Sequence, residues 1–308
     1  MRRLRTVANG ERDIQDSALI FVHIPKAAGS TLHHLLEMQY APEESFATCS
    51  TPRYPHGDLN RFEALGEKEL AGIRLLNGHM GYGLHRYLPR PAVYITFLRE
   101  PVERVLSHYS FERTLAQSPV YPYLQSGDMD LKEYVRYYTE AGDMDNLQTR
   151  MIAGNWHKRG FGPCTPEMLA QARRNLRERF AVIGLAEQFD ASYLLLKRHF
   201  GWRSAFFQRR NQTRRRIYRD ELSTDELDYI RQHNEFDLQL YAYAQQLFEE
   251  QIRRQGPSFQ TELALFRLQN RLYNQYRKAR TYSVRTRMRH ILQLPGPEQN
   301  NNGSRERA

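Results

Sequence analysis

Residues 18–40 have the sequence ALIFVHIPKAAGSTLHHLLEMQY, and this segment decides the fold class. Its first residues are apolar and rich in β-formers, which predicts a short buried strand. A loop of small residues follows, PKAAGST, and LHHLLEMQY then places Leu32, Leu35, Leu36 and Tyr40 at helical spacing. The segment therefore predicts a strand, a tight loop and a helix in succession.

The alternation of strands and helices continues along the chain. Further strands are predicted at IRLLNGH, which ends at His79, at AVYITFL from Ala92, and at AVIGLAE from Ala181. Helices are predicted between them, including RFEALGEKEL, VERVLSHYSFERTL after Pro101, and a long stretch that breaks near Asn234. This order predicts an α/β fold in which helices flank a parallel β-sheet.

Composition divides the chain into four parts. Residues 1–17 are polar and are expected to form a flexible arm, and residues 18–255 are expected to form the main domain. Residues 256–294 predict a basic amphipathic helical extension, with Leu265, Leu268, Leu272, Tyr276 and Ala279 on one face. Residues 295–308 carry no large apolar side chain and are expected to be disordered.

The formal net charge of +10 suggests a polyanionic partner, but its distribution argues against one for the main domain. Residues 251–308 contain 12 Lys and Arg against 3 Asp and Glu, which leaves a net charge of +1 for the rest of the chain. No helix-turn-helix, zinc or RNA-binding signature accompanies the basic tail. Nucleic acid is therefore not the expected partner, and an enzyme is the first hypothesis. The alternative hypothesis is a basic nucleic-acid-binding or nucleotide-binding scaffold protein without transferase activity.

The compartment is inferred from the cysteines and from the start of the chain. Cys49 and Cys164 are the two cysteines, too few for a disulfide framework, which fits a reducing compartment. No apolar run approaches the ~18 residues of a membrane span, and MRRLR is not followed by the apolar region of a signal peptide. We expect a cytoplasmic location, with the basic tail as a candidate for binding an anionic membrane surface or a partner subunit.

The loop HIPKAAGST, from His23, has the features of an anion-binding site. Backbone N–H groups of small residues converge on an anion at a helix N-terminus, Lys26 adds a mobile positive charge, and Ser30 and Thr31 add hydroxyl donors. The loop is not a Walker A motif, which places its Lys directly before the hydroxyl residue. An ordinary turn between strand and helix is the alternative.

A second candidate anion site lies in FLREPVERVLSHY. Arg99 ends a predicted strand, where open α/β sheets bind their ligands, and Ser107 follows eight residues later. A guanidinium can hold a phosphate with two hydrogen bonds. Two anion sites and no recognisable pair of acidic Mg²⁺ ligands predict a ligand with two separated phosphate-like groups. A surface Arg beside an unrelated Ser is the alternative for this segment taken alone.

Together these segments resemble the sulfotransferase superfamily, in the carbohydrate branch related to heparan sulfate and uronyl 2-O-sulfotransferases. HIPKAAGST is similar to that family's loop for the 5′-phosphosulfate of the donor PAPS (3′-phosphoadenosine 5′-phosphosulfate), and LREPVERVLSHY is similar to its 3′-phosphate motif. The resemblance covers roughly residues 18–250 and implies the P-loop-containing nucleotide-hydrolase-like sulfotransferase fold.

The resemblance also implies an activity, the transfer of a sulfuryl group from PAPS to a hydroxyl of a carbohydrate acceptor without a metal ion. His79, in NGHM, matches the family's general base, and Lys26 would stabilise the leaving phosphate. Without the resemblance, a structural histidine is the alternative at His79. The residues expected to bind the donor are Lys26, Ala27, Ala28, Gly29, Ser30, Thr31, Arg99, Ser107, Thr213 and Arg214.

The acceptor site is less well marked. Thr213 and Arg214 belong to RRNQTRRR, which either closes over the donor or is a solvated charged loop. Ala27 stands where related loops commonly have Thr, which removes one hydroxyl contact with the donor but keeps the backbone cradle.

The residues expected to contact the carbohydrate are His34, His85, Arg86, Gln148 and Arg150.

Overall fold

The computed structural model describes residues 16–49, 58–140, 144–154, 163–202, 206–208 and 216–292, with side chains as far as residue 280. Within these residues, five strands form one parallel sheet in the order β2-β3-β1-β4-β5. The strands are β1 Ala18–Val22, β2 Ser45–Ala47, β3 Leu75–Gly78, β4 Ala92–Leu98 and β5 Phe180–Leu185. The expected α/β fold with a parallel sheet flanked by helices is confirmed.

The register of the three central strands decides where the functional groups meet. Val22 of β1 pairs with Gly78 of β3 on one side and with Thr96 of β4 on the other. Because the strands are parallel, their carboxyl ends lie along one edge of the sheet. The residues that follow β1, β3 and β4 in the chain are therefore brought together at that edge.

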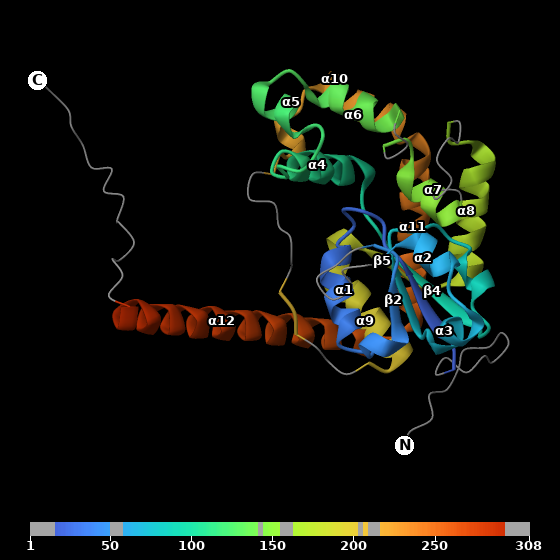
Figure 1. Ribbon diagram of the computed structural model, residues 1–308, viewed down its shortest axis with the longest axis vertical. Coiled ribbons are helices and arrows are strands. Elements are labelled where there is room, and N and C mark those ends of the chain that lie inside the picture. The colour runs from blue at the N-terminus through green and yellow to red at the C-terminus, as the bar shows by residue number, and fades with distance from the viewer. Residues whose placement is uncertain are drawn as a thin grey trace, which may run out of the picture.

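Helices cover both faces of the sheet (Figure 1). On one face lie α1 Gly29–Glu37 and α9 Phe189–Phe200. The segments that follow these two helices meet in an edge-on contact between Tyr40 and Trp202, with 6.5 Å between ring centroids. On the other face α8 Pro166–Arg179 and α11 Glu235–Arg254 pack against β5. The core between these layers includes the fully buried side chains of Phe21, Leu32, Leu76, Phe97 and Leu194.

A second, smaller core belongs to a helical group above the carboxyl edge of the sheet (Figure 1). Its buried residues include Val105, Leu106, Tyr134 and Ile230. The helices of this group are α4 Pro101–Glu112, α5 Tyr121–Ser126, α6 Leu131–Glu140 and α10 Thr224–His233, and α7 Leu147–Ala153 runs from it toward α8. The short 3₁₀ helices are η1 Pro42–Glu44, η2 Leu84–Tyr87, η3 Ala186–Gln188 and η4 Arg219–Glu221.

Three local expectations differ from the structure, and a fourth is confirmed. The single helix expected at RFEALGEKEL is wrong, because the segment forms α2 Leu59–Glu63 and α3 Glu67–Gly72. Gly66 between them has an extended backbone, and its N–H donates to the Glu69 carboxylate at 3.0 Å, which starts a new helix. Strand β2 lies within residues 41–60, whose three prolines predict a loop, and α5 forms where no helix is predicted. The predicted break at Asn234 is confirmed between α10 and α11.

The chain after α11 forms α12 Ser258–Leu292, which leaves the body of the molecule (Figure 1). No helix in the described part of the chain is both long and apolar enough to cross a membrane. The arm expected at residues 1–17 and the disorder expected at residues 295–308 fall wholly or almost wholly outside the described residues. The four-part division and the cytoplasmic location stay predictions.

Candidate functional site

The loop between β1 and α1 has an unusual backbone. Lys26 has φ 68° and Ala28 has φ 63°, both in the left-handed region that residues other than glycine seldom adopt. Ala28 is also the N-cap residue of α1, and its methyl side chain cannot accept a hydrogen bond from the first turn. Strained backbone of this kind is retained where surrounding structure and function require it. The N-terminus of α1 therefore has no side-chain cap, and it is the kind of position at which helices bind anions.

Gly29 is required by the histidine packed against it. A Cβ atom on Gly29 would lie 1.8 Å from Nε2 of His23, closer than any real contact. The His23 ring stacks on Phe21, with 5.4 Å between centroids, and contacts the His79 ring at 4.6 Å. Its Nδ1 is buried without a hydrogen-bond partner, and burial, followed by the charge of His79, lowers its pKa well below the ordinary value. His23 is therefore a neutral packing element between the loop and His79.

Lys26 carries the positive charge of the loop in a half-buried position. Its Nζ lies 3.8 Å from the centroid of the Phe111 ring on α4. Burial, and next the charge of Arg99, lower the pKa of Lys26 to about 8, and Glu112 partly opposes this. A pKa of about 8 keeps the ammonium mainly charged at pH 7. An anion bound at the loop would offset both causes.

Arg99 connects the loop to the end of β4. Its Nη1 donates to the carbonyl oxygen of Lys26 at 3.0 Å, and its Nη2 lies 3.7 Å from Oε2 of Glu103. Burial, followed by the charge of Arg216, lowers the pKa of Arg99 to about 10, so the guanidinium stays charged at neutral pH. Two half-buried cations thus share one end of the sheet.

The backbone of Arg99 is held by Gln148 at the start of α7. The Gln148 amide donates to the Arg99 carbonyl at 2.9 Å and accepts from the Arg99 N–H at 3.0 Å. Asp237 of α11, fully buried, accepts from the N–H groups of Gln148 at 3.1 Å and Thr149 at 2.7 Å. Gln148, expected to contact the carbohydrate, is therefore placed to fix the position of Arg99.

His79 follows β3 directly and is half-buried beside His23. Burial, and then the charges of His33 and Lys26, lower the pKa of His79 to about 4. The imidazole is neutral at pH 7 and can accept a proton. Its backbone carbonyl accepts from Oγ1 of Thr48 at 3.4 Å, which ties it to the segment after β2.

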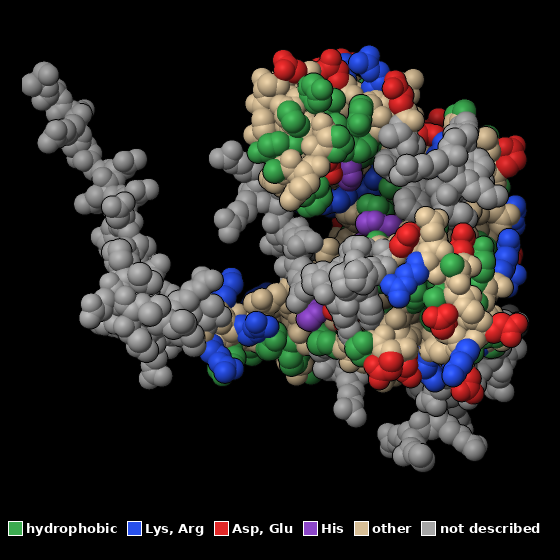
Figure 2. Space-filling view, in the orientation of Figure 1, with side chains coloured by type: hydrophobic (Ala, Val, Ile, Leu, Met, Phe, Trp, Pro, Cys, Tyr) green, Lys and Arg blue, Asp and Glu red, His purple; other side chains and the backbone are tan. Residues whose placement is uncertain are grey.

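Three residues of α4 face the same site. Glu103, Ser107 and Phe111 are spaced four residues apart and so lie on one side of the helix. Glu103 contacts Arg99 and Phe111 contacts Lys26, which places Ser107 between the two cations. Figure 2 shows Lys, Arg and His side chains gathered in a hollow between the helical group and the sheet.

The arginine-rich loop reaches this hollow at its end. Arg216, the first described residue after the gap at residues 209–215, donates to Glu103 and forms an ion pair with it. Thr213 and Arg214 lie outside the described residues. The sequence alone does not mark Glu103 as a site residue, because a glutamate in the first turn of a helix is common for its favourable interaction with the helix N-terminus.

The residues expected to contact the carbohydrate are dispersed. His34 of α1 is partly exposed, with Nδ1 3.7 Å from Glu37. His85 shares a hydrogen bond of 2.8 Å between its Nδ1 and the hydroxyl of Tyr94, and Arg86 beside it is exposed. Tyr94 precedes Arg99 by five residues, about 16 Å of strand, so His85 lies toward the other end of the sheet.

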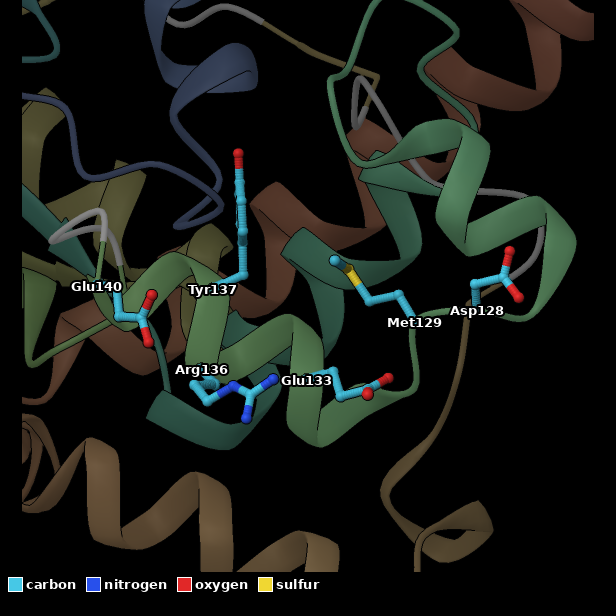
Figure 3. A pocket seen from close by; sticks show the side chains of 6 residues that line it. All are labelled: Asp128, Met129, Glu133, Arg136, Tyr137 and Glu140. Atoms are coloured by element: carbon cyan, nitrogen blue, oxygen red, sulfur yellow. The ribbon is translucent and has the colours of Figure 1, made fainter.

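Arg150 is engaged in an ion pair, and a separate pocket lies along α6. The Arg150 side chain is buried in an ion pair with Asp145, whose carboxylate also accepts from the N–H of Cys164. The α6 pocket is lined by Asp128, Met129, Glu133, Arg136, Tyr137 and Glu140. Figure 3 shows these six side chains pointing in different directions, and their three carboxylates would repel an anionic ligand.

Comparison with known proteins agrees with this geometry. The family model of galactose-3-O-sulfotransferase matches residues 10–279, which include every element from β1 to the first two-thirds of α12. The chain belongs to the galactose-3-O-sulfotransferase family. This confirms the carbohydrate sulfotransferase superfamily expected from the loop motifs, and it identifies the branch as one named for galactose 3-O-sulfation.

The individual members of the galactose-3-O-sulfotransferase and heparan-sulfate 6-O-sulfotransferase groups that this chain resembles share low sequence identity with it. It is 24% identical over 200 residues to mouse galactose-3-O-sulfotransferase 2, covering 60% of the chain and 49% of the relative. It is 26% identical over 295 residues to heparan-sulfate 6-O-sulfotransferase 1 of Cricetulus griseus, covering 78% of the chain and 70% of the relative. The chain thus spans about half the length of the mouse relative. The assigned roles of individual site residues stay predictions.

Proposed function

We propose that this protein transfers a sulfuryl group from PAPS to a hydroxyl of a carbohydrate acceptor. The observation that carries the proposal is the meeting of two half-buried cations, Lys26 and Arg99, with a neutral histidine, His79, at the carboxyl edge of the sheet. The family membership supports the same reaction class.

The donor fits the residues in two places. The loop and first turn of α1, from Ala27 to Thr31, and the Lys26 ammonium suit the 5′-phosphosulfate, because this helix N-terminus has no side-chain cap and follows left-handed backbone at Lys26 and Ala28. Arg99 and Ser107 suit the 3′-phosphate. Both cations have pKa values lowered by burial, so anionic ligands would relieve an unfavourable concentration of positive charge.

The donor, when bound, supplies an activated sulfuryl group on a phosphate leaving group. The new bond joins the acceptor oxygen to sulfur, and the broken bond is that between sulfur and the bridging phosphate oxygen. His79 takes the hydroxyl proton at one imidazole nitrogen, and Lys26 stabilises the negative charge that collects on the leaving phosphate. Negative charge near Lys26 would also raise the pKa of His79 from about 4, which strengthens the base once the donor is in place.

The donor assignment is tested by thermal unfolding with adenosine 3′,5′-bisphosphate in the presence of EDTA. We expect stabilisation without a divalent metal. No shift at saturating ligand, or a shift that requires ATP and Mg²⁺, contradicts the assignment and supports a kinase-like or scaffold protein.

The reaction itself is tested by transfer of labelled sulfate from PAPS to a panel of polysaccharides, glycolipids and simple glycosides. His79→Ala should abolish transfer and keep the bisphosphate stabilisation, because the base does not bind the donor. Full turnover in this variant moves the base elsewhere. His108→Gln is the matched control, because His108 is hydrogen-bonded to Tyr134 and we expect its role to be structural.

The nucleic-acid-binding or scaffold reading is the second candidate. It draws on the basic tail and on the arginine cluster of residues 209–216, although residues 1–250 as a whole are close to neutral. Binding of DNA or RNA that survives physiological salt, with no transfer to any acceptor, would favour it.

A further inference from the structure

Helix α12 is attached to the body by one of its faces. Phe259, Leu263 and Phe266 are buried, and the Phe266 ring lies 5.7 Å from that of Tyr193 on α9. Farther along, Asn270 accepts from the N–H of Phe207 at 2.9 Å, and Asn274 donates to its carbonyl at 3.0 Å. These contacts fix which side of the helix faces the protein. After Asn274 the helix continues for eighteen residues, about 27 Å, away from the body (Figure 1).

The opposite side of α12 carries an apolar stripe, which we define as Leu265, Leu268, Leu272 and Tyr276. Their exposed fractions are 52%, 51%, 55% and 65%, among the largest of any hydrophobic residues described. At 100° per residue the stripe occupies an arc of about 80°, and its centre lies roughly 150° from the attached face. The stripe therefore faces away from the body of the molecule.

Positive charge accompanies the stripe. Residues 258–280 contain five Lys and Arg and a single acidic residue, Glu262. Glu262 is already paired with Lys197 and Arg198 of α9, at 3.3 Å and 2.7 Å. Figure 2 shows Lys and Arg side chains on the part of α12 that projects. Arg267 is also paired, with Asp190 of α9 at 3.5 Å, so the surplus of cations on the helix comes from the residues that follow it.

We propose that the stripe of α12 binds the surface of an anionic phospholipid bilayer, with the helix lying in the plane of the interface. Leucine and tyrosine side chains suit the boundary between headgroups and acyl chains, and flanking cations suit anionic headgroups. Because the stripe faces away from the body, a flat surface can approach it without colliding with the domain.

Charge decides between this occupant and two others. A second copy of α12 would bring like charges together along a stripe of only two heptads, too short for a stable coiled coil in isolation. A polyanionic glycan would match the cations but would gain nothing from exposed leucines. The bilayer matches both features, and this inference is independent of the sulfotransferase proposal.

The test is sedimentation of the full-length protein with vesicles. We expect binding to an equimolar mixture of phosphatidylcholine and phosphatidylglycerol, weak binding to phosphatidylcholine alone, and loss of binding at high salt. Leu268→Gln with Leu272→Gln should lower vesicle affinity by at least about tenfold. Leu268→Met with Leu272→Met is the matched control and should bind as the wild type does. Arg271→Gln with Lys278→Gln should lower affinity for the anionic vesicles by about tenfold or more.

Folding does not confound this test, because the substituted side chains are exposed and urea unfolding of each variant checks the fold. Equal vesicle binding by the wild type and by the double variant Leu268→Gln with Leu272→Gln overturns the proposal. Equal binding of the wild type to neutral and anionic vesicles also overturns it. The proposal is also overturned, in favour of a second copy, if the wild type does not bind vesicles but forms a dimer in sedimentation velocity that the double variant Leu268→Gln with Leu272→Gln abolishes.

Discussion

Replacing Gly29 with alanine sets two physical effects against each other. The added Cβ would lie 1.8 Å from Nε2, 1.9 Å from Cδ2 and 2.6 Å from Cε1 of His23. Relieving these contacts requires the ring to move by more than ~1 Å, since carbon atoms pack at about 3.5 Å. The ring is confined by its stacking on Phe21 and its contact with His79. Gly29→Ala therefore disturbs the loop and His79 together.

The two effects have opposite signs. Gly29 begins α1 with no positive φ, so alanine is conformationally allowed and would stabilise the helix by at most about 1 kcal/mol. Overpacking in a filled core costs about 1–3 kcal/mol. Because three ring atoms clash at once, we expect the second effect to prevail, with a net loss of about 1–2 kcal/mol in the free energy of unfolding.

Urea unfolding measures this loss, and Gly72→Ala is the matched control. Gly72 ends α3 and has nothing within 4 Å of its missing Cβ, so alanine there should leave stability unchanged or raise it slightly. The double variant His23→Ala with Gly29→Ala removes the clash and should couple by at least about 1 kcal/mol.

An increase in stability from Gly29→Ala, equal to that from Gly72→Ala, would refute the packing of His23 on the loop. So would strict additivity of the His23 and Gly29 substitutions, since the argument requires the two positions to be in contact.

Three further predictions concern charge and position. Lys26→Met should raise stability by about 1 kcal/mol, because a lowered pKa means that the buried charge opposes folding, while lowering bisphosphate affinity by at least about tenfold in calorimetry; unchanged affinity would remove Lys26 from the donor site. Gln148→Leu removes both hydrogen bonds to the Arg99 backbone, so it should lower the free energy of unfolding in urea by about 1–3 kcal/mol and weaken bisphosphate binding. Unchanged binding would mean that these two hydrogen bonds serve stability alone. Acid should destabilise the protein from pH 6.5 toward pH 4, because His79 and His108 have folded pKa values of about 4 and about 3, below the ordinary value near 6.5, and the folded state therefore binds fewer protons. The loss between pH 7 and 5, about 1–2 kcal/mol per histidine, is read from urea unfolding at each pH, and a stability that rises over this range contradicts it.

Some elements could be predicted because their signals are local. The strand at Ala18–Val22 and the helix after it follow from an apolar run and from helical spacing within a single segment. Strand β2 could not be predicted in this way, because three residues in a proline-containing loop have no periodicity, and pairing with β3 is what makes them a strand. The break at RFEALGEKEL depends on the capping of Gly66 by Glu69, a weak signal beside the helical pattern around it.

The site shows the same division. Lys26 and Arg99 could be predicted, because parallel strands present their carboxyl ends at one edge of a sheet. The contribution of Gln148 could not, since its partner Asp237 lies 89 residues away and the pair is set by the packing of α7 on α11. Likewise Arg216 reaches Glu103 across 113 residues of chain.

The strand, loop and helix of residues 18–40, the positive charges at the two anion motifs and the basic character of the tail all follow from the sequence without a structure. Tertiary structure alone decided that His23 fills the space above Gly29, that Gln148 serves Arg99, and that the α12 stripe faces away from the body. The reason is physical: periodicity tells which side of an element is apolar, whereas register and packing between distant segments decide what that side meets.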